Sequence, residues 1–168
     1  MSIITSKHDI RIAVPSTVDN AQAVEAWLVA MSDASWRVIT DFRNWPHWIP
    51  QMDSVEQEDS GPPARGTRLI IEREGAISVC TIDRWDPPRS LQISMGLGAG
   101  EIAYGFLIET GLKQGQIRLS LELERSLEGL SRLAPFISRW RLRRLGGKIL
   151  ANLAPRTKAA IKIGRAHV

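Results

Sequence analysis

The chain has 168 residues, 43% of them apolar, which is enough for one globular domain with a sizeable core. Its one cysteine, Cys80, excludes an internal disulfide framework and a cysteine-based zinc cluster. The apolar runs are too short to cross a bilayer and no signal peptide opens the sequence, so we expect a cytoplasmic protein. No motif predicts a metal or a cofactor.

The formal charge of +4 is unevenly divided along the chain. Residues 1–128 contain 12 basic and all 18 acidic residues, a charge of −6, whereas residues 129–168 contain ten Arg or Lys and no acid. Such a division indicates either an anionic partner or a basic helix that lies against an acidic sheet.

The first third of the chain predicts a strand and two short helices. Residues 1–21 read as an extra edge strand or as a loosely held arm. The apolar segment Ala23–Met31 reads as the first strand, and Ser32 or Asp33 is expected to cap the helix that follows. The stretch after Asp33 reads DASWRVITDFRNWPHWIP, and its two prolines forbid one continuous helix. We therefore expect two short helices that meet at a bend, with their aromatic faces turned into a concavity.

The segments from residue 53 to residue 125 alternate between apolar and polar residues and are joined by turn residues. This pattern predicts an antiparallel sheet with one dry face. We expect that face to carry Thr67, Leu69 and Ile71; Ile77, Val79 and Thr81; Leu91, Ile93, Met95 and Leu97; Ile102, Tyr104, Phe106 and Ile108; and Ile117, Leu119, Leu121 and Leu123.

A helix that begins near Pro135 is expected to cover the dry face. Its apolar stripe is predicted to consist of Ile137, Trp140, Leu145, Ile149 and Leu153. The pair Gly146-Gly147 weakens its interior, and Pro155 is expected to kink or end it. The predicted fold class is therefore α+β, with a curved antiparallel sheet wrapped around a long C-terminal helix.

Two motifs carry a resemblance to a known superfamily. The first comprises Ala34, Trp36, Asp41-Phe42 and the W-P-x-W-x-P sequence from Trp45 to Pro50, and the second is Trp85-Asp86-Pro87-Pro88-Arg89. Both resemble the SRPBCC superfamily (START-like, Bet v 1-like proteins), in particular its polyketide cyclase/dehydrase-like branch. The resemblance covers about residues 22–155. It implies a helix-grip domain, which we expect over residues 22–162.

The resemblance also implies a cavity between the sheet and the last helix. Such a cavity would take a hydrophobic small molecule, for example a lipid, an isoprenoid quinone or a polyketide-like compound, which the protein would carry or chaperone. The expected lining is Trp48, Leu69, Ile71, Val79, Thr81, Ile93, Met95, Tyr104, Phe106, Ile137 and Trp140. Taken singly, each of these residues is more often part of a filled core than a ligand contact, and it is the resemblance that favours a cavity for the set.

Catalysis is an alternative function, as a cyclase or dehydratase. The sequence contains no recognisable catalytic constellation. His47 and Tyr104 are the candidates for an acid, a base or a ligand-orienting group, and both also have structural interpretations. Arg73 and Asp83 could reach the cavity from strand ends, or could form solvent-facing ion pairs.

The basic helix offers a third function, lipid transfer at an anionic membrane surface. Arg139, Arg143, Arg144 and Lys148 are the candidates for contact with lipid headgroups. A solvated helix explains the same charges, and no motif predicts nucleic-acid binding. Residues 163–168 correspond to a translated sequencing adapter, so we expect them to be a scar and give them no role.

Overall fold

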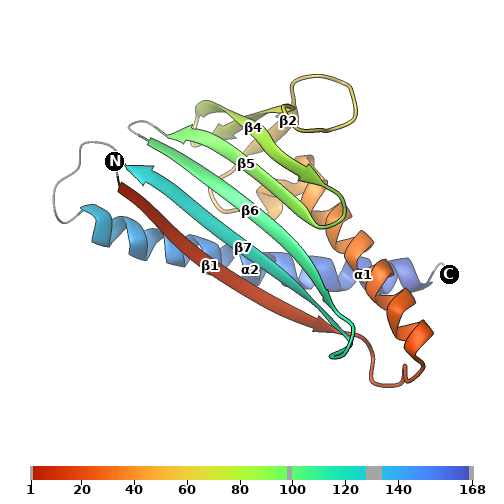
Figure 1. Cartoon of the computed structure of the whole chain (residues 1–168). Coiled ribbons are helices and arrows are strands. Elements are labelled where there is room, and N and C mark those ends of the chain that lie inside the picture. The colour runs from red at the N-terminus through yellow and green to blue at the C-terminus, as the bar shows by residue number, and fades with distance from the viewer. Residues whose placement is uncertain (1, 98–99, 128–133, 167–168) are drawn as a thin grey trace.

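The computed structural model describes residues 2–97, 100–127 and 134–166. Ten elements follow one another along the chain, and η1 among them is a 3-10 helix. They are β1 (Ser2–Ala13), α1 (Ala21–Thr40), η1 (Phe42–His47), β2 (Ser54–Gln57), β3 (Arg68–Arg73), β4 (Ala76–Asp86), β5 (Ser90–Leu97), β6 (Gly100–Gly111), β7 (Gln116–Leu127) and α2 (Ala134–Ala166), as Figure 1 shows.

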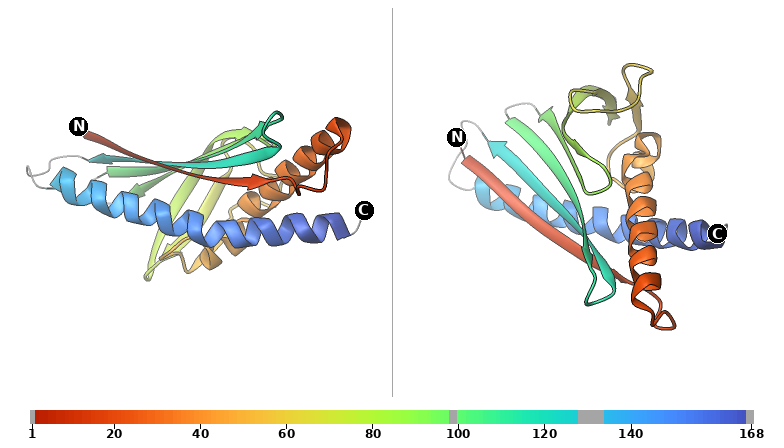
Figure 2. Two further views of the ribbon diagram at one scale, coloured as in Figure 1. Left: turned by 90° about the horizontal axis from the view of Figure 1, so that it is seen from below. Right: turned by 45° about the vertical axis from the view of Figure 1, so that its right-hand side comes forward.

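The seven strands form one antiparallel sheet in the order β1-β7-β6-β5-β4-β3-β2. β1 pairs with β7 from Ser2 to Ala13 and forms one edge of the sheet. The sheet curves, and both α1 and α2 lie on its concave side, with α2 running beneath it (Figure 2). The α+β helix-grip fold is confirmed, and of the two alternatives for residues 1–21 the structure shows the edge strand.

The alternation of β6 and β7 explains why this sheet has a dry concave face. Opposed pairs such as Phe106 and Leu121 both point inward, and both are buried. Their neighbours in sequence, Leu107 and Ser120, face the convex side and are exposed or half-buried. Because successive side chains on a strand alternate between the two faces, the apolar positions that the sequence indicates on β5, β6 and β7 face the concave side, except that the side chain of Leu97 lies outside the described part of the chain.

α2 packs across β1, β7 and α1 and buries one side of its length. Its buried apolar side chains are Leu142, Ile149, Leu150, Leu153 and Ile161. At Gly146 the helix comes very close to the imidazole of His8 on β1, and only a residue without a Cβ leaves room there. The helix continues through the exposed Pro155 to Ala166, so this proline does not end it.

The prediction of a first strand at Ala23–Met31 is wrong. These residues form the first half of the 20-residue helix α1, which Asn20 caps by accepting hydrogen bonds from the amides of Gln22 (2.8 Å) and Ala23 (3.3 Å). Ser32 and Asp33 therefore lie inside the helix and do not cap it. A short apolar run cannot be assigned to helix or strand from its sequence alone, and here the buried stripe of α1 continues past Met31 to Ile39.

The aromatic motif after α1 fills one end of the concave side. The bend that the two prolines predict is confirmed, since α1 ends at Thr40 and η1 begins at Phe42. Trp45 is fully buried, and its indole N–H donates to the carbonyl of Ile39 at 2.7 Å. The rings of Trp45 and Trp48 both pack against Phe106 of β6, with centroid distances of 6.5 and 5.8 Å. Trp45, Trp48 and Phe106 together form an aromatic plug at this end of the fold.

Candidate functional site

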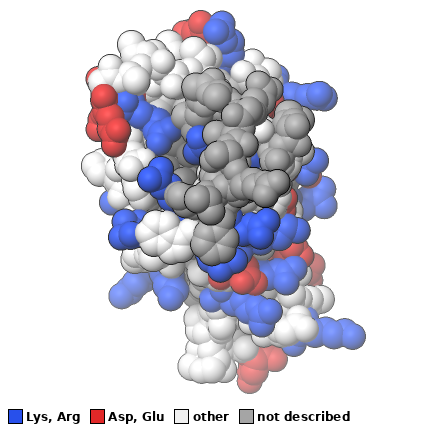
Figure 3. Space-filling view, turned by 90° about the vertical axis from the view of Figure 1, so that its left-hand side faces the viewer, with Lys and Arg blue, Asp and Glu red and all other residues white. Residues whose placement is uncertain are grey.

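A pocket of about 430 Å³ opens between the concave face of the sheet and the first half of α2. This size lies within the range of ~300–1,000 Å³ that small-molecule sites occupy. Thirteen residues line it: Pro50, Gln51, Arg73, Ile102, Tyr104, Arg125, Ser138, Trp140, Arg141, Leu142, Arg144, Leu145 and Lys148. Lys and Arg side chains are gathered at the end of the molecule where α2 begins, as Figure 3 shows.

One part of the pocket wall is apolar. Ile102 on β6 and Leu142 on α2 contribute buried aliphatic side chains, and α2 adds the half-buried Leu145. The ring of Tyr104, two residues after Ile102 and therefore on the same face of β6, continues this surface inward. The apolar wall extends from the core of the protein toward the opening.

The rest of the wall is strongly basic. Arg73, at the end of β3, and Arg125, near the end of β7, both reach the pocket from the concave face. α2 adds Arg141, Arg144 and Lys148, and no Asp or Glu belongs to the lining formed by the described residues. None of these five cationic side chains forms a salt bridge within the described ranges, whereas the four ion pairs that the structure shows lie elsewhere.

Two of the basic side chains have neutral partners. The guanidinium of Arg73 donates a hydrogen bond to the side-chain oxygen of Gln51 at 3.2 Å, and Gln51 itself has a positive φ of 68°. The guanidinium of Arg144 lies 5.4 Å from the ring centroid of Trp140, which is a cation–π contact. Neither contact neutralises a charge, so the pocket keeps its full positive potential.

Arg125 and Tyr104 place polar groups deeper in the pocket. The Nε of Arg125 is buried and has no hydrogen-bond partner among the described residues. Burial raises the pKa of the Tyr104 phenol to about 12, although the nearby Arg73 and Arg125 both act to lower it. Tyr104 is therefore protonated at neutral pH and can donate a hydrogen bond to a ligand.

Most of the predicted lining belongs to the filled core. Tyr104 and Trp140 line the pocket, as predicted from the sequence. Six other predicted residues also lie on the concave side, but they are packed against other side chains and are at most 3% exposed: Trp48, Leu69, Ile71, Ile93, Met95 and Phe106. The pocket is lined by Ile102 and Tyr104 on β6, next to the aromatic plug, because Phe106 is the following inward residue of the same strand.

Two predicted lining residues lie on the wrong face of the sheet. β4 turns Cys80 and Ile82 inward, so Val79 is 40% exposed on the convex side and Thr81 points the same way. The register decides this, because Cys80 pairs with the buried Leu69 of β3. The side chain of Ile137 lies outside the described part of the chain.

The prediction of Trp140 in the apolar stripe of the helix is wrong. Its indole is 57% exposed, and Leu142 is the buried residue at this level of α2. Trp140 instead forms part of the rim of the pocket, next to Arg144.

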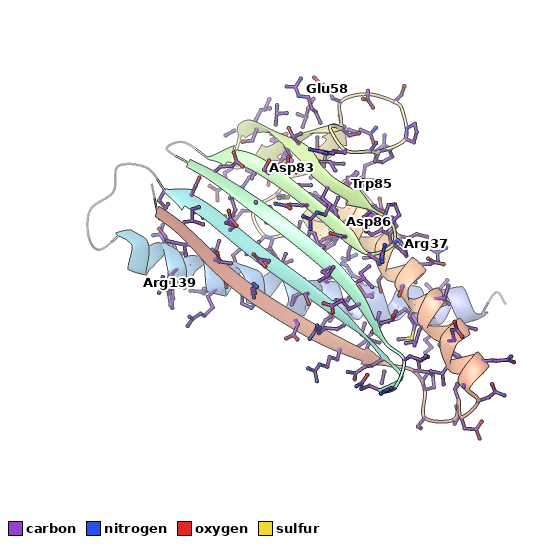
Figure 4. The ribbon with its side chains drawn as sticks, in the orientation of Figure 1. Arg37, Glu58, Asp83, Trp85, Asp86 and Arg139 are labelled. Atoms are coloured by element: carbon purple, nitrogen blue, oxygen red, sulfur yellow. The ribbon has the colours of Figure 1, made fainter. Side chains whose placement is uncertain are left out.

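The remaining candidates lie outside the pocket. His47 is exposed at the end of η1, and Asp83 is exposed on β4. Arg139 and Arg143 are exposed on α2 without lining the pocket, and Figure 4 shows Arg139 directed away from the strands. Of the four residues proposed for membrane contact, only Arg144 and Lys148 also line it.

Sequence reasoning missed Arg125, although a signal for it was present. The inward positions of β7 recur at every second residue from Ile117 to Leu123, and the same period places Arg125 on the concave face. Ile102 was predicted to face inward but not to line the site. Gln51 lies directly after the W-P-x-W-x-P motif, and no sequence pattern indicated its bond to Arg73.

The family of the chain follows from its sequence together with this geometry. Residues 29–157, which are most of the chain, match the family described as polyketide cyclase / dehydrase and lipid transport. The chain belongs to this family. The long helix gripped by a seven-stranded antiparallel sheet is the SRPBCC, Bet v 1-like arrangement, and the family indicates a protein that binds hydrophobic small molecules.

Solved structures share the fold of this polyketide cyclase-like chain at low sequence identity. Ara h 8.0201 is 15% identical with a TM-score of 0.59, and the match covers 94% of this chain and 99% of that one. The di-domain ARO/CYC StfQ from the steffimycin biosynthetic pathway is 12% identical with a TM-score of 0.66, and the match covers 99% of this chain. This chain spans only 52% of the StfQ chain.

A third similar structure is the hypothetical protein jhp0584 from Helicobacter pylori, which is 13% identical with a TM-score of 0.55. That match covers 93% of this chain and 88% of the other. No protein among those with curated functions matches the sequence. Within the described ranges, no helix of this family member has the length and apolar character that a bilayer crossing requires.

Proposed function

We propose that this protein binds a hydrophobic small molecule in the pocket between β6, β7 and α2, and acts as its carrier or chaperone. The observation that supports the proposal is the pocket of about 430 Å³, whose apolar wall is formed by Ile102, Leu142 and Leu145. A concave, partly apolar site with a few fixed polar groups is typical of small-molecule binding. The family name points to the same class of ligand.

A carrier fits the pocket better than a cyclase or dehydratase does. Such enzymes need a group that accepts a proton from the ligand, and the part of the lining that the structure describes contains no carboxylate and no histidine. His47 is exposed at the end of η1 and does not line the pocket. Tyr104 is protonated at neutral pH because burial raises the pKa of its phenol to about 12, so it orients a ligand rather than acting as a base.

Native mass spectrometry of the protein purified from its own cells tests this proposal. We expect a co-purified apolar compound at a one-to-one ratio. The variant Leu145→Trp fills the pocket and should lose the compound, whereas Ala151→Trp, at an exposed position of the same helix outside the lining, should keep it. Loss of the compound from both variants, or retention by both, would contradict binding in this pocket.

Lipid transfer at an anionic membrane is a second candidate, and the exposed Trp140 favours it. Its indole is 57% exposed beside the guanidinium of Arg144. Tryptophan is enriched at membrane interfaces, and each nearby Arg or Lys adds about 1 kcal/mol of attraction to an anionic surface. The same helix exposes Arg139 and Arg143.

Co-sedimentation with vesicles of phosphatidylglycerol and phosphatidylcholine tests membrane docking. We expect binding that falls as salt rises and that is weakened by the double change Arg139→Glu with Arg143→Glu, which leaves the pocket lining intact. The control Lys158→Glu changes an exposed charge on the other half of α2. Equal binding by the double variant and the control would refute docking through the first half of the helix.

A further inference from the structure

We propose that the pocket selects amphipathic ligands that carry a carboxylate or phosphate group, with the anion held by Arg73, Arg125 and Tyr104 and the apolar part held by Ile102, Leu142 and Leu145. This inference rests on the proposed function and names the class of ligand more closely. A ligand that is hydrophobic throughout would not explain why the rest of the pocket wall is basic.

The charge of the pocket is the first step of the argument. Five cationic side chains surround a space of about 430 Å³, and no acidic group is present in the lining within residues 2–97, 100–127 and 134–166. Elsewhere in the described chain four basic residues do meet acids directly, as Arg118 does with Glu109 at 2.8 Å and Lys7 with Glu122 at 3.4 Å, whereas none of the five in the pocket does. Cations that lack counter-charges repel one another, and an anion bound among them relieves this repulsion.

The buried donors are the second step. The Nε of Arg125 is buried without a partner in the described residues, and leaving a buried donor unsatisfied is destabilising. Arg125 pairs across the sheet with Ile102 on the concave face, and both line the pocket. A carboxylate or phosphate in the pocket that Arg125 lines would accept from the other nitrogens of the same guanidinium, and arginine matches the geometry of both anions. Charge on Arg73 and Arg125 also acts on the Tyr104 phenol, so the three groups lie close to one another.

The arrangement of the two walls is the third step. Ile102 and Tyr104 are neighbours on one face of β6, and Arg125 follows the buried Leu123 on one face of β7. Each of these two strands therefore brings a polar group next to an apolar one. A ligand with an anionic end and an apolar end satisfies both walls, whereas a neutral hydrocarbon leaves the arginines unpaired.

Isothermal titration with matched ten-carbon ligands tests the selectivity. Decanoate, decyl phosphate and decanol share an apolar chain and differ in charge. For the full-length protein at pH 7.5 and low salt, we expect decanoate and decyl phosphate to bind about tenfold or more tightly than decanol, because hydrogen bonds to charged groups are the stronger ones. A higher salt concentration should reduce the difference in affinity between the two anionic ligands and decanol.

Matched variants locate the anion. Arg125→Met keeps the apolar stem and removes the charge, so it should bring decanoate affinity down about tenfold, close to that of decanol, with decanol itself unchanged. The control Arg139→Met removes an exposed charge of α2 that does not line the pocket. It should leave the affinities for decanoate and for decanol unchanged. Should Arg125→Met fail to fold, Arg73→Gln gives the same test from β3.

The outcomes separate this inference from the proposed function. Equal affinity for decanoate, decyl phosphate and decanol would overturn anion selectivity and leave hydrophobic binding standing, and no binding of any of the three would overturn both. A second experiment, binding to phosphatidylglycerol vesicles, distinguishes an anionic lipid headgroup from a free anionic compound. Arg125-dependent binding to vesicles as well as to decanoate indicates a lipid headgroup, and decanoate binding alone indicates a free anion. Vesicle binding that is independent of Arg125, without decanoate binding, would place the anion site on the surface and overturn the inference.

Discussion

Two adjacent glycines in α2 offer a sharp test of how closely this helix approaches β1. A Cβ at Gly146 would collide with the Cδ2 and Nε2 atoms of the His8 imidazole, whereas a Cβ at Gly147 would have no atom within 4 Å. His8 cannot easily move away, since its Nε2 is hydrogen-bonded to the Ser6 hydroxyl at 2.7 Å. Alanine favours a helix interior over glycine by about 1 kcal/mol, and overpacking costs about 1–3 kcal/mol. We expect Gly147→Ala to raise the free energy of unfolding by about 1 kcal/mol and Gly146→Ala to lower it by up to about 2 kcal/mol.

Urea unfolding followed by circular dichroism measures both effects, with a double-mutant cycle as the control. In a His8→Ala background the obstacle is gone, so Gly146→Ala should become stabilising by about the same amount as Gly147→Ala. If Gly146→Ala stabilises the native sequence as much as Gly147→Ala does, α2 does not lie against β1 as described, and the grip on which the pocket depends is wrong.

Three further predictions concern the stability of the fold that forms the pocket. Burial raises the pKa of the Cys80 thiol from 9.0 to about 12, so the unfolded chain ionises first as pH rises. This thiol should leave stability unaffected below about pH 8.5 and lower it between pH 9 and 12, by about 2 kcal/mol at pH 10.5. In urea titrations Cys80→Ala should weaken the fall in stability, and the fall that remains above pH 10 comes from Tyr104, whose pKa is also raised. Trp45→Phe removes the donor to the Ile39 carbonyl and some ring volume, and should lower the unfolding free energy by about 3 kcal/mol; an unchanged midpoint would contradict the aromatic plug. Asn20→Ala removes the cap of α1 and should cost about 1 kcal/mol, against no measurable change for an exposed control such as Gln22→Ala.

Most of the sheet could be predicted from the sequence because its strands are exposed on one face and buried on the other. Where the alternation is unbroken, as from Ile117 to Leu123, the inward face is unambiguous. β4 breaks the rule, since Ile77 and Val79 are apolar and yet face solvent. Its true register depends on pairing with Leu69 of β3, which is a tertiary contact that no single strand encodes.

The helices show a similar limit. The apolar segment that opens α1 has the length and composition of a buried strand, and its helical character appears only when it is read together with Trp36 and Ile39 beyond it. Trp140 was assigned to the core because large aromatic residues usually lie there, but a rim position next to Arg144 exposes it. The helical spacing of Trp140 alone does not distinguish a position in the core from one at the rim of the pocket.

The candidate site was the least predictable part of the molecule. Sequence reasoning from hydrophobicity selected the residues that fill the core, such as Ile93 and Met95, because a filled core and an empty cavity have the same apolar composition. The pocket begins where the apolar faces end, at Arg73 on β3 and Arg125 on β7. A cation that continues the inward period of an apolar strand is therefore the more informative signal in this fold.

Intermolecular NOE spectroscopy on methyl-labelled protein with bound decanoate tests the central claim most directly. We expect contacts from the decanoate chain to the methyl groups of Ile102, Leu142 and Leu145, and a chemical-shift change at the side chain of Arg125. Contacts to Leu107 on the convex face of the sheet, or the absence of contacts to all three pocket residues in a saturated sample, would contradict a ligand site between α2 and the sheet.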